Sequence, residues 1–251
     1  MEHAPMTLFR AISAFCGSSI GRKILVSVTG IALLLFLAVH LAGNLLIYSG
    51  REAMNSYAYG LHNLFHGSFV WIARIGLLAC VVIHVVFTIL LTKENRAARV
   101  TPYASPKTTI QATLASRTMI WSGMVILAFV VYHILHFTVQ VTPGVKAAEL
   151  AGPPVQAIYG VTQGEIVYDV YNMVVTGFSY WYVSAFYIIA VALLCSHLSH
   201  GFSSAFQTLG LRSKRTSAVI KKVGIGYAVV IFIGNISIPI SVLTGIIEKA
   251  N

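Results

Sequence analysis

Long apolar runs alternate with shorter polar segments along the whole chain. Five runs stand out, at 24–48, 70–92, 118–140, 172–198 and 223–247. A helix needs about 20 apolar residues to cross a bilayer, so each run predicts one membrane-spanning helix. Pro239 lies inside the fifth run, where we expect a kink or an irregular turn.

The composition supports a membrane protein and excludes other classes. Hydrophobic residues make up 57% of the 251 residues and charged residues only 10%, whereas an average soluble domain carries about 25% charged residues. This balance excludes a soluble globule and a disordered chain, and three cysteines exclude a disulfide scaffold. The first run begins after Arg22-Lys23 and is too long for a cleavable signal peptide. We therefore expect an all-α, polytopic, single transmembrane domain over residues 1–251, with no room for a soluble domain.

Positive charge is divided unevenly between the two sides of the membrane that five spans define. The chain has 17 Lys and Arg against 7 Asp and Glu, a formal net charge of +10. Thirteen of the 17 lie before the first run or in the second and fourth loops, and the other four are Arg51, Arg74, Lys146 and Lys249. Because cytoplasmic loops carry the excess of Lys and Arg, we expect a cytoplasmic N-terminus and an external C-terminus. The basicity then reflects topology, and we expect no nucleic-acid partner.

Histidine is frequent for so apolar a chain. Six of the nine histidines lie inside an apolar run or at its polar end: His40, His84, His133, His136, His197 and His200. Burying an ionisable group in hydrocarbon is costly, so each is a functional-site candidate. A neutral histidine bonded to a neighbouring helix is the plain alternative, but it explains poorly why four consecutive runs each carry one.

Haem binding accounts for imidazoles in such positions. Haem iron takes imidazole nitrogen as an axial ligand, so four helices with one ligand each would enclose two bis-histidine b-type haems. Zinc is a weaker explanation because its ligands come in close groups. A proton relay would need carboxylates, which the cores of the first three runs lack.

Depth in the membrane predicts which histidines pair. At about 1.5 Å per residue, His40 lies roughly 25 Å from Lys23, and His133 lies roughly 24 Å from Arg117. These two histidines are the expected outer pair.

The inner pair follows in the same way. His84 lies about 14 Å from Lys93, and His197 is at the cytoplasmic end of its run, fifteen residues before Arg212. We therefore pair His84 with His197 and expect the fourth helix to project into the cytoplasm.

A short internal repeat supports the outer pair. The first run contains Thr29-Gly30, Leu34, Phe36 and His40, and the third contains Ser122-Gly123, Leu127, Phe129 and His133 at the same spacing. Glycine lets a macrocycle or a second helix approach the backbone closely. The repeat favours His133 over His136 as the ligand, although chance agreement between two apolar helices is the alternative.

Over nearly its whole length the chain resembles the single-chain, five-helix, dihaem cytochrome b subunit of succinate:quinone oxidoreductases, which include menaquinol-dependent fumarate reductases. The residues that carry this resemblance are Ser27, Thr29-Gly30 through His40, Ile83-His84, Tyr132-His133 and His197 through Gly210. The family's fourth-helix ligand precedes a closing glycine by thirteen residues, and His197 with Gly210 keeps that spacing whereas His200 does not. The resemblance implies His40, His84, His133 and His197 as iron ligands.

The resemblance also implies a complex in the cell inner (cytoplasmic) membrane. A flavoprotein subunit carrying FAD would interconvert succinate and fumarate, and an iron–sulfur subunit would dock on the basic cytoplasmic face. This chain would pass electrons through two haems b to a quinone, expected to be menaquinone, and none of the dicarboxylate chemistry would lie here. A higher oligomer of the heterotrimer is compatible with this arrangement.

Further contacts are expected around the cofactors. Ser27 matches a family position that contacts propionates of the inner haem, and Arg117 is a cation at a suitable depth for the same role. His136 is placed to bond a propionate or a quinone. Candidates for the quinone site are Asn44, His62, His66 and Arg74, which a polar periplasmic cap explains equally well. Some fumarate reductases of this type carry a glutamate two residues before the fourth-helix ligand for proton transfer, and this chain has Cys195 there.

Three other interpretations are weaker. A hydrogenase or formate dehydrogenase anchor is another dihaem cytochrome b, but it is usually four-helical with a different ligand pattern. A quinol:cytochrome c reductase core places two ligands on each of two helices, and no run here holds such a pair. A histidine-using transporter predicts inverted repeats and broken helices, whereas the repeat here joins two runs of the same direction. A haem-free anchor leaves four buried histidines unexplained.

Overall fold

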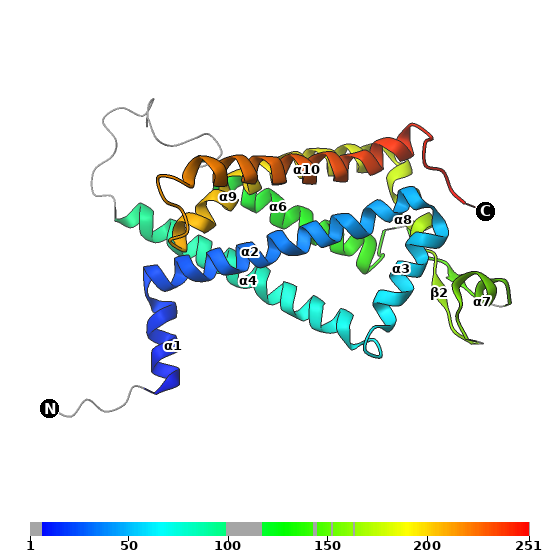
Figure 1. Cartoon of the computed structure of the whole chain (residues 1–251), viewed down its shortest axis with the longest axis horizontal. Helices are drawn as coiled ribbons and strands as arrows, with labels where there is room; N and C mark the ends of the chain where they lie inside the picture. The colour runs from blue at the N-terminus through cyan, green and yellow to red at the C-terminus, as the bar shows by residue number, and fades with distance from the viewer. Residues whose placement is uncertain (1–6, 99–116, 143–144, 152, 163, 251) are drawn as a thin grey trace.

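A computed structural model describes residues 7–98, 117–142, 145–151, 153–162 and 164–250. Five helices within these residues are long and apolar enough to cross a membrane, at Ser19–Ser49, Ser68–Ala97, Met119–Thr138, Trp181–Thr208 and Ser217–Leu243. They run along the long axis of the molecule, with Ser68–Ala97 set obliquely to the others (Figure 1). The prediction of an all-α polytopic bundle with five spans is confirmed as far as helix number, length and composition are concerned. By the same criteria the chain is a multi-pass membrane protein.

The first three spans lie close to their predicted places. They comprise α2 (Ser19–Asn44) with the 3-10 turn η1 (Leu45–Ser49), α4 (Ser68–Ala97), and α6 (Met119–His133) with η2 (Ile134–Thr138). The segment η2 is a π-helix, in which the amide of Val139 bonds to the carbonyl of Ile134 at 2.8 Å. A π-helical turn inside an α-helix often marks a functional site, and this one contains His136.

The fourth apolar run forms two helices instead of one. The short helix α8 (Val170–Ser179) ends at Tyr180, which has an extended backbone, and the membrane helix α9 (Trp181–Thr208) begins immediately after it. The Ser184 hydroxyl donates a hydrogen bond to the carbonyl of Phe178 at 2.7 Å. This bond gives that carbonyl a partner at the junction, where the helical hydrogen bonds are interrupted. The predicted span 172–198 was therefore placed about ten residues too early, because apolar content alone does not reveal a break in a helix.

The fifth span, α10 (Ser217–Leu243), differs in the opposite direction, because it begins earlier than predicted, and it continues as a helix through Pro239 to Leu243. Helix α10 packs along α9, α2 packs against α4, and α9 lies between α10 and α6. Buried Leu41, Leu198 and Ile231 form a core where α2, α9 and α10 meet. Helix α4 contributes no buried residue within its length, so it borders the bundle.

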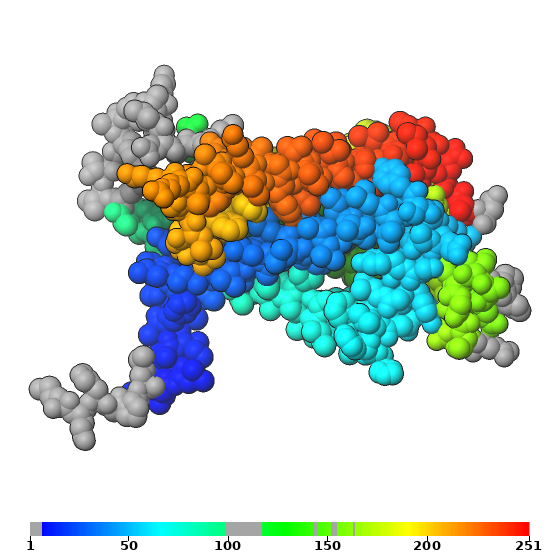
Figure 2. Space-filling model, in the orientation of Figure 1, coloured from blue at the N-terminus to red at the C-terminus, as the bar shows by residue number. Residues whose placement is uncertain are grey.

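Shorter elements close the two ends of the bundle. Helix α1 (Leu8–Gly17) lies across the axis of α2 and stands clear of the body at one end (Figures 1 and 2). The other end carries α3 (Arg51–Asn63), α7 (Pro153–Tyr159) and α8, with a two-stranded antiparallel sheet of β1 (Glu149–Leu150) and β2 (Val167–Tyr168). The segment after α10 also lies at this second end (Figure 1).

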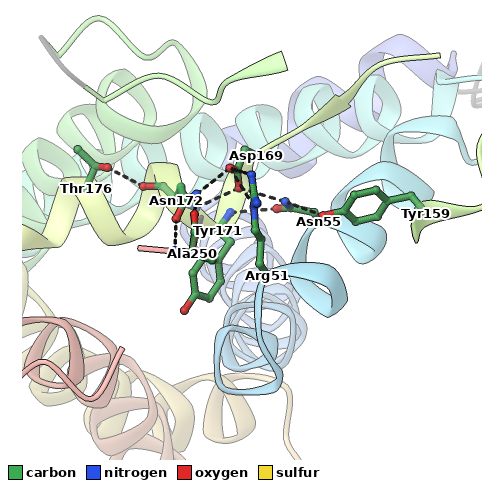
Figure 3. A network of polar contacts seen from close by, with 8 residues as sticks. All are labelled: Arg51, Asn55, Tyr159, Asp169, Tyr171, Asn172, Thr176 and Ala250. Carbon is green, nitrogen blue, oxygen red and sulfur yellow. Dashed lines mark hydrogen bonds and ion pairs between the residues drawn. The ribbon is translucent and has the colours of Figure 1, made fainter. Parts of the chain in front are cut away.

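A buried carboxylate holds the second end together. Asp169, which is 3% exposed, accepts hydrogen bonds from Arg51 at 2.7 Å, from Asn55 at 3.1 Å and from Asn172 at 2.8 Å (Figure 3). Asn172 in turn bonds to the backbone of Ala250. These contacts, the Asp169 network, join α3, α8 and the C-terminal segment. Burial raises the pKa of Asp169, but the hydrogen bonds from Arg51, Asn55 and Asn172 outweigh it and leave that pKa below its usual value.

Candidate functional site: two histidine pairs

The inner histidine His84 projects from α4 onto the start of α2. Its Nδ1 lies 3.1 Å from the carbonyl oxygen of Val26 and 3.3 Å from the Thr29 hydroxyl. Gly30 faces the ring so closely that a Cβ atom there would lie 3.2 Å from Cε1 of His84. Because a carbonyl can only accept, Nδ1 carries the proton, and Nε2 is left with the free lone pair.

His197 repeats this arrangement on α6. Its Nδ1 lies 3.2 Å from the Ser122 hydroxyl, which itself donates a hydrogen bond to the carbonyl of Met119 at 3.1 Å. A Cβ atom at Gly123 would lie 3.5 Å from Cε1 of His197. Met119, Ser122 and Gly123 stand at the same spacing as Val26, Thr29 and Gly30. The repeat seen in the sequence is therefore a pair of matching sites, in each of which a hydroxyl and a glycine face one histidine.

The outer histidines meet directly between α2 and α6. The ring centroids of His40 and His133 lie 5.7 Å apart, with the ring planes at 88°. In each helix the phenylalanine four residues earlier packs against its histidine, Phe36 at 5.3 Å and Phe129 at 5.9 Å between centroids. About 15 Å separate this pair from the sites that face the inner histidines along either helix, since ten residues lie between glycine and histidine.

A tyrosine from α9 connects the outer pair to His136. The hydroxyl of Tyr187 lies 3.3 Å from Nδ1 of His133 and 2.9 Å from Nδ1 of His136. His136 is fully buried, and its Nε2 has no hydrogen-bond partner among the residues that the structure describes. Gly177 on α8 makes room for Phe137 and His136, because a Cβ atom there would lie 2.8 Å from Cε1 of Phe137 and 3.2 Å from Cε1 of His136. Sequence analysis did not find Tyr187, since nothing in the sequence distinguishes it from Tyr180 or Tyr182.

The remaining predicted residues near the two histidine pairs differ in burial. Ser27 is buried on α2, beside Val26 of the site that faces His84. Arg117 is exposed, two residues before α6 begins. Asn44 is half-buried at the end of α2, one turn beyond His40.

Three predicted quinone-site residues lie elsewhere, on the exposed corner between α3 and α4. His62 bonds through Nδ1 to the carbonyl of Ala58 at 2.8 Å, and His66 sits in the connecting turn with a φ of 54°. The guanidinium of Arg74 lies over the ring of Trp71 at 5.2 Å. The contacts seen for His62 and Arg74 are local, which suits a polar cap at the membrane surface at least as well as a binding site.

The chemistry of the donor set suits a metal held by two imidazoles at a time. Within the described parts of the chain, no three His, Cys, Asp or Glu side chains gather in a way that could hold a metal ion. Hydrogen bonds at Nδ1 orient His84 and His197 and leave Nε2 of each available, which is the usual preparation of a histidine ligand. Imidazoles prepared in this way are donors of the type that haem iron takes as axial ligands.

Comparisons of this chain with protein-family models, with curated proteins and with solved structures found no match.

Proposed function

We propose that this chain is the membrane-anchor cytochrome b subunit of a succinate:quinone oxidoreductase, carrying electrons between an iron–sulfur subunit and a membrane quinone. The observation that carries the proposal is the presence of two histidine pairs at two levels of one five-helix bundle. His40 on α2 meets His133 on α6. At the other level, His84 on α4 lies against Gly30 and His197 on α9 lies against Gly123, each glycine ten residues before an outer histidine on the same helix. This is the ligand set that two bis-histidine haems b require.

Each group of residues has a defined task in this proposal. A bound haem supplies reversible one-electron chemistry at its iron. Thr29 and the carbonyl of Val26 fix the orientation of His84, and Ser122 fixes that of His197. The two histidine pairs lie about 15 Å apart along α2, which is half the thickness of a hydrocarbon core of about 30 Å.

The proposal also covers the partner subunits, the membrane in which the chain lies and the quinone. Basic residues of the second and fourth loops, such as Arg96, Arg212 and Arg215, would face the cytoplasm and receive the iron–sulfur subunit, to which a flavoprotein with FAD is attached. The membrane would be the cell inner membrane, and menaquinone is the expected quinone. His136 would donate a hydrogen bond to a quinone oxygen or a propionate, because its Nε2 is buried without a partner among the described residues.

Haem quantification tests the ligand assignment. We expect the purified protein to hold two haems b per chain, low-spin in both oxidation states, and His40→Ala or His133→Ala to hold one. The matched control is His62→Ala, because His62 is exposed on α3 and should leave both haems in place. Two haems in the His40→Ala or His133→Ala protein would refute the outer pairing, and no haem in the unmodified protein would favour a transporter or a haem-free anchor.

Copurification separates the succinate complex from other dihaem anchors. Affinity purification of the tagged chain from native membranes should recover a covalently or tightly bound flavin protein and an iron–sulfur protein, with succinate-dependent quinone reduction. Recovery of a hydrogenase or a formate dehydrogenase subunit in their place would contradict the assignment to succinate:quinone oxidoreductases while leaving the haem ligands intact.

A further inference from the structure

The Tyr187 hydroxyl occupies an unusual position, within hydrogen-bond distance of two histidines. It faces Nδ1 of His133 at 3.3 Å and Nδ1 of His136 at 2.9 Å. The rings of Phe129, Phe178 and Phe137 surround its own ring, with centroids at 5.1, 5.0 and 5.9 Å. Packing of this kind holds the tyrosine in one orientation, so its hydroxyl is a fixed element of the outer site.

The number of available protons decides which group donates and which accepts in these two hydrogen bonds. A phenol has one proton to donate and can accept from a second donor. If His133 binds iron through Nε2, its Nδ1 carries a proton and must donate it to the Tyr187 oxygen. The phenol proton is then directed to Nδ1 of His136, the shorter of the two contacts, and His136 becomes the tautomer protonated at Nε2.

We propose that Tyr187 is a positioning residue that accepts from His133 and donates to His136, thereby tuning the outer haem ligand. The proposal rests on the proposed function, in which His133 is an iron ligand. A hydrogen bond accepted from Nδ1–H orients a ligand ring and makes its Nε2 more basic, and a more basic ligand favours ferric iron. Tyr187 therefore lowers the reduction potential at the outer pair and leaves the inner pair unaffected.

Redox titration of Tyr187→Phe tests this role, with Tyr132→Phe as the matched control. Tyr132 belongs to the same aromatic cluster, with its ring 5.3 Å from that of His136, and its hydroxyl shows no hydrogen bond within the described residues. We expect Tyr187→Phe to retain two haems, with one midpoint potential raised and the other unchanged, and to alter the low-spin electron paramagnetic resonance signal of one haem only. Tyr132→Phe should reproduce the unmodified protein in both measurements. Unchanged potentials in Tyr187→Phe, or an equal shift in Tyr132→Phe, would overturn the proposal.

A second measurement needs no change at Tyr187. Nitrogen-15 magnetic resonance of histidine-labelled protein in the reduced state should show His136 protonated at Nε2, with its resonances identified by their loss in His136→Ala. A His136 protonated at Nδ1 would overturn the proposal. If the unmodified protein binds no haem, the proposed function fails, and the tautomer of His136 still shows whether Tyr187 donates to it.

Discussion

Removing the Asp169 carboxylate should loosen the end of the bundle formed by α3, α8 and the C-terminal segment. In Asp169→Ala, Arg51 loses the acceptor for its Nε and Nη2 atoms, and the amides of Asn55 and Asn172 lose the acceptor that they share. Breaking a buried ion pair by removing one partner costs about 3–5 kcal/mol. The Arg51 side chain is 25% exposed and can regain some hydration, so we expect about 3 kcal/mol, at the lower limit of that range.

Thermal unfolding in detergent measures this loss. At about 2–4 °C per kcal/mol for a chain of this size, the midpoint of Asp169→Ala should fall by roughly 6–12 °C. Glu149→Gln is the matched control, because Glu149 is an exposed carboxylate on β1 at the same end of the molecule, and surface substitutions usually change stability by less than about 0.5 kcal/mol. A midpoint for Asp169→Ala within about 2 °C of the unmodified protein would refute the energetic role of the Asp169 network.

The pH dependence provides an independent check of the same reasoning. The folded pKa of Asp169 lies below its unfolded value, which is about 3.9 for a free aspartate. Its stabilisation is therefore complete above that unfolded value and is lost as the pH falls through the lower folded pKa. The difference in midpoint between the unmodified protein and Asp169→Ala should be constant from pH 7 to pH 5 and shrink only in strong acid. A difference that already shrinks near pH 6 would contradict this assignment.

Three substitutions test the histidine site. Gly30→Ala would place a methyl group 3.2 Å from Cε1 of His84, so the ring must move by a few tenths of an ångström, and we expect a changed spectrum or reduced occupancy of one haem on quantification. Gly123→Ala leaves an ordinary contact of 3.5 Å with His197, so we expect unchanged haem content and a gain of up to about 1 kcal/mol from helix propensity, measured by thermal unfolding. His136→Ala should retain both haems, and a protein with one haem would reassign the outer ligand.

The architecture of the membrane-spanning part could be predicted because it depends on local properties of the sequence. Apolar runs longer than about 20 residues are enough to predict a spanning helix, and all five were found. The placement of His40 and His133 at equal depth follows from counting residues along a helix of known rise, and their rings do meet between α2 and α6. The spacing shared by Thr29-Gly30 and Ser122-Gly123 was also visible in the sequence. That these residues face His84 and His197 was seen only in the structure.

Contacts between distant parts of the chain were decided only by the tertiary structure. The break at Tyr180 does not interrupt the apolar pattern, so the fourth span was predicted too early. The pairing of Arg51 with Asp169, 118 residues apart, required the folded positions of α3 and α8. The same is true of Tyr187, whose hydroxyl meets His133 and His136 from another helix. The sequence by itself determined how many segments are apolar enough to cross a membrane and which of them carry imidazoles, because hydropathy and helical rise act over a few turns. The partners in a hydrogen bond or an ion pair come from separate helices, so they could be identified only from the way in which the helices pack.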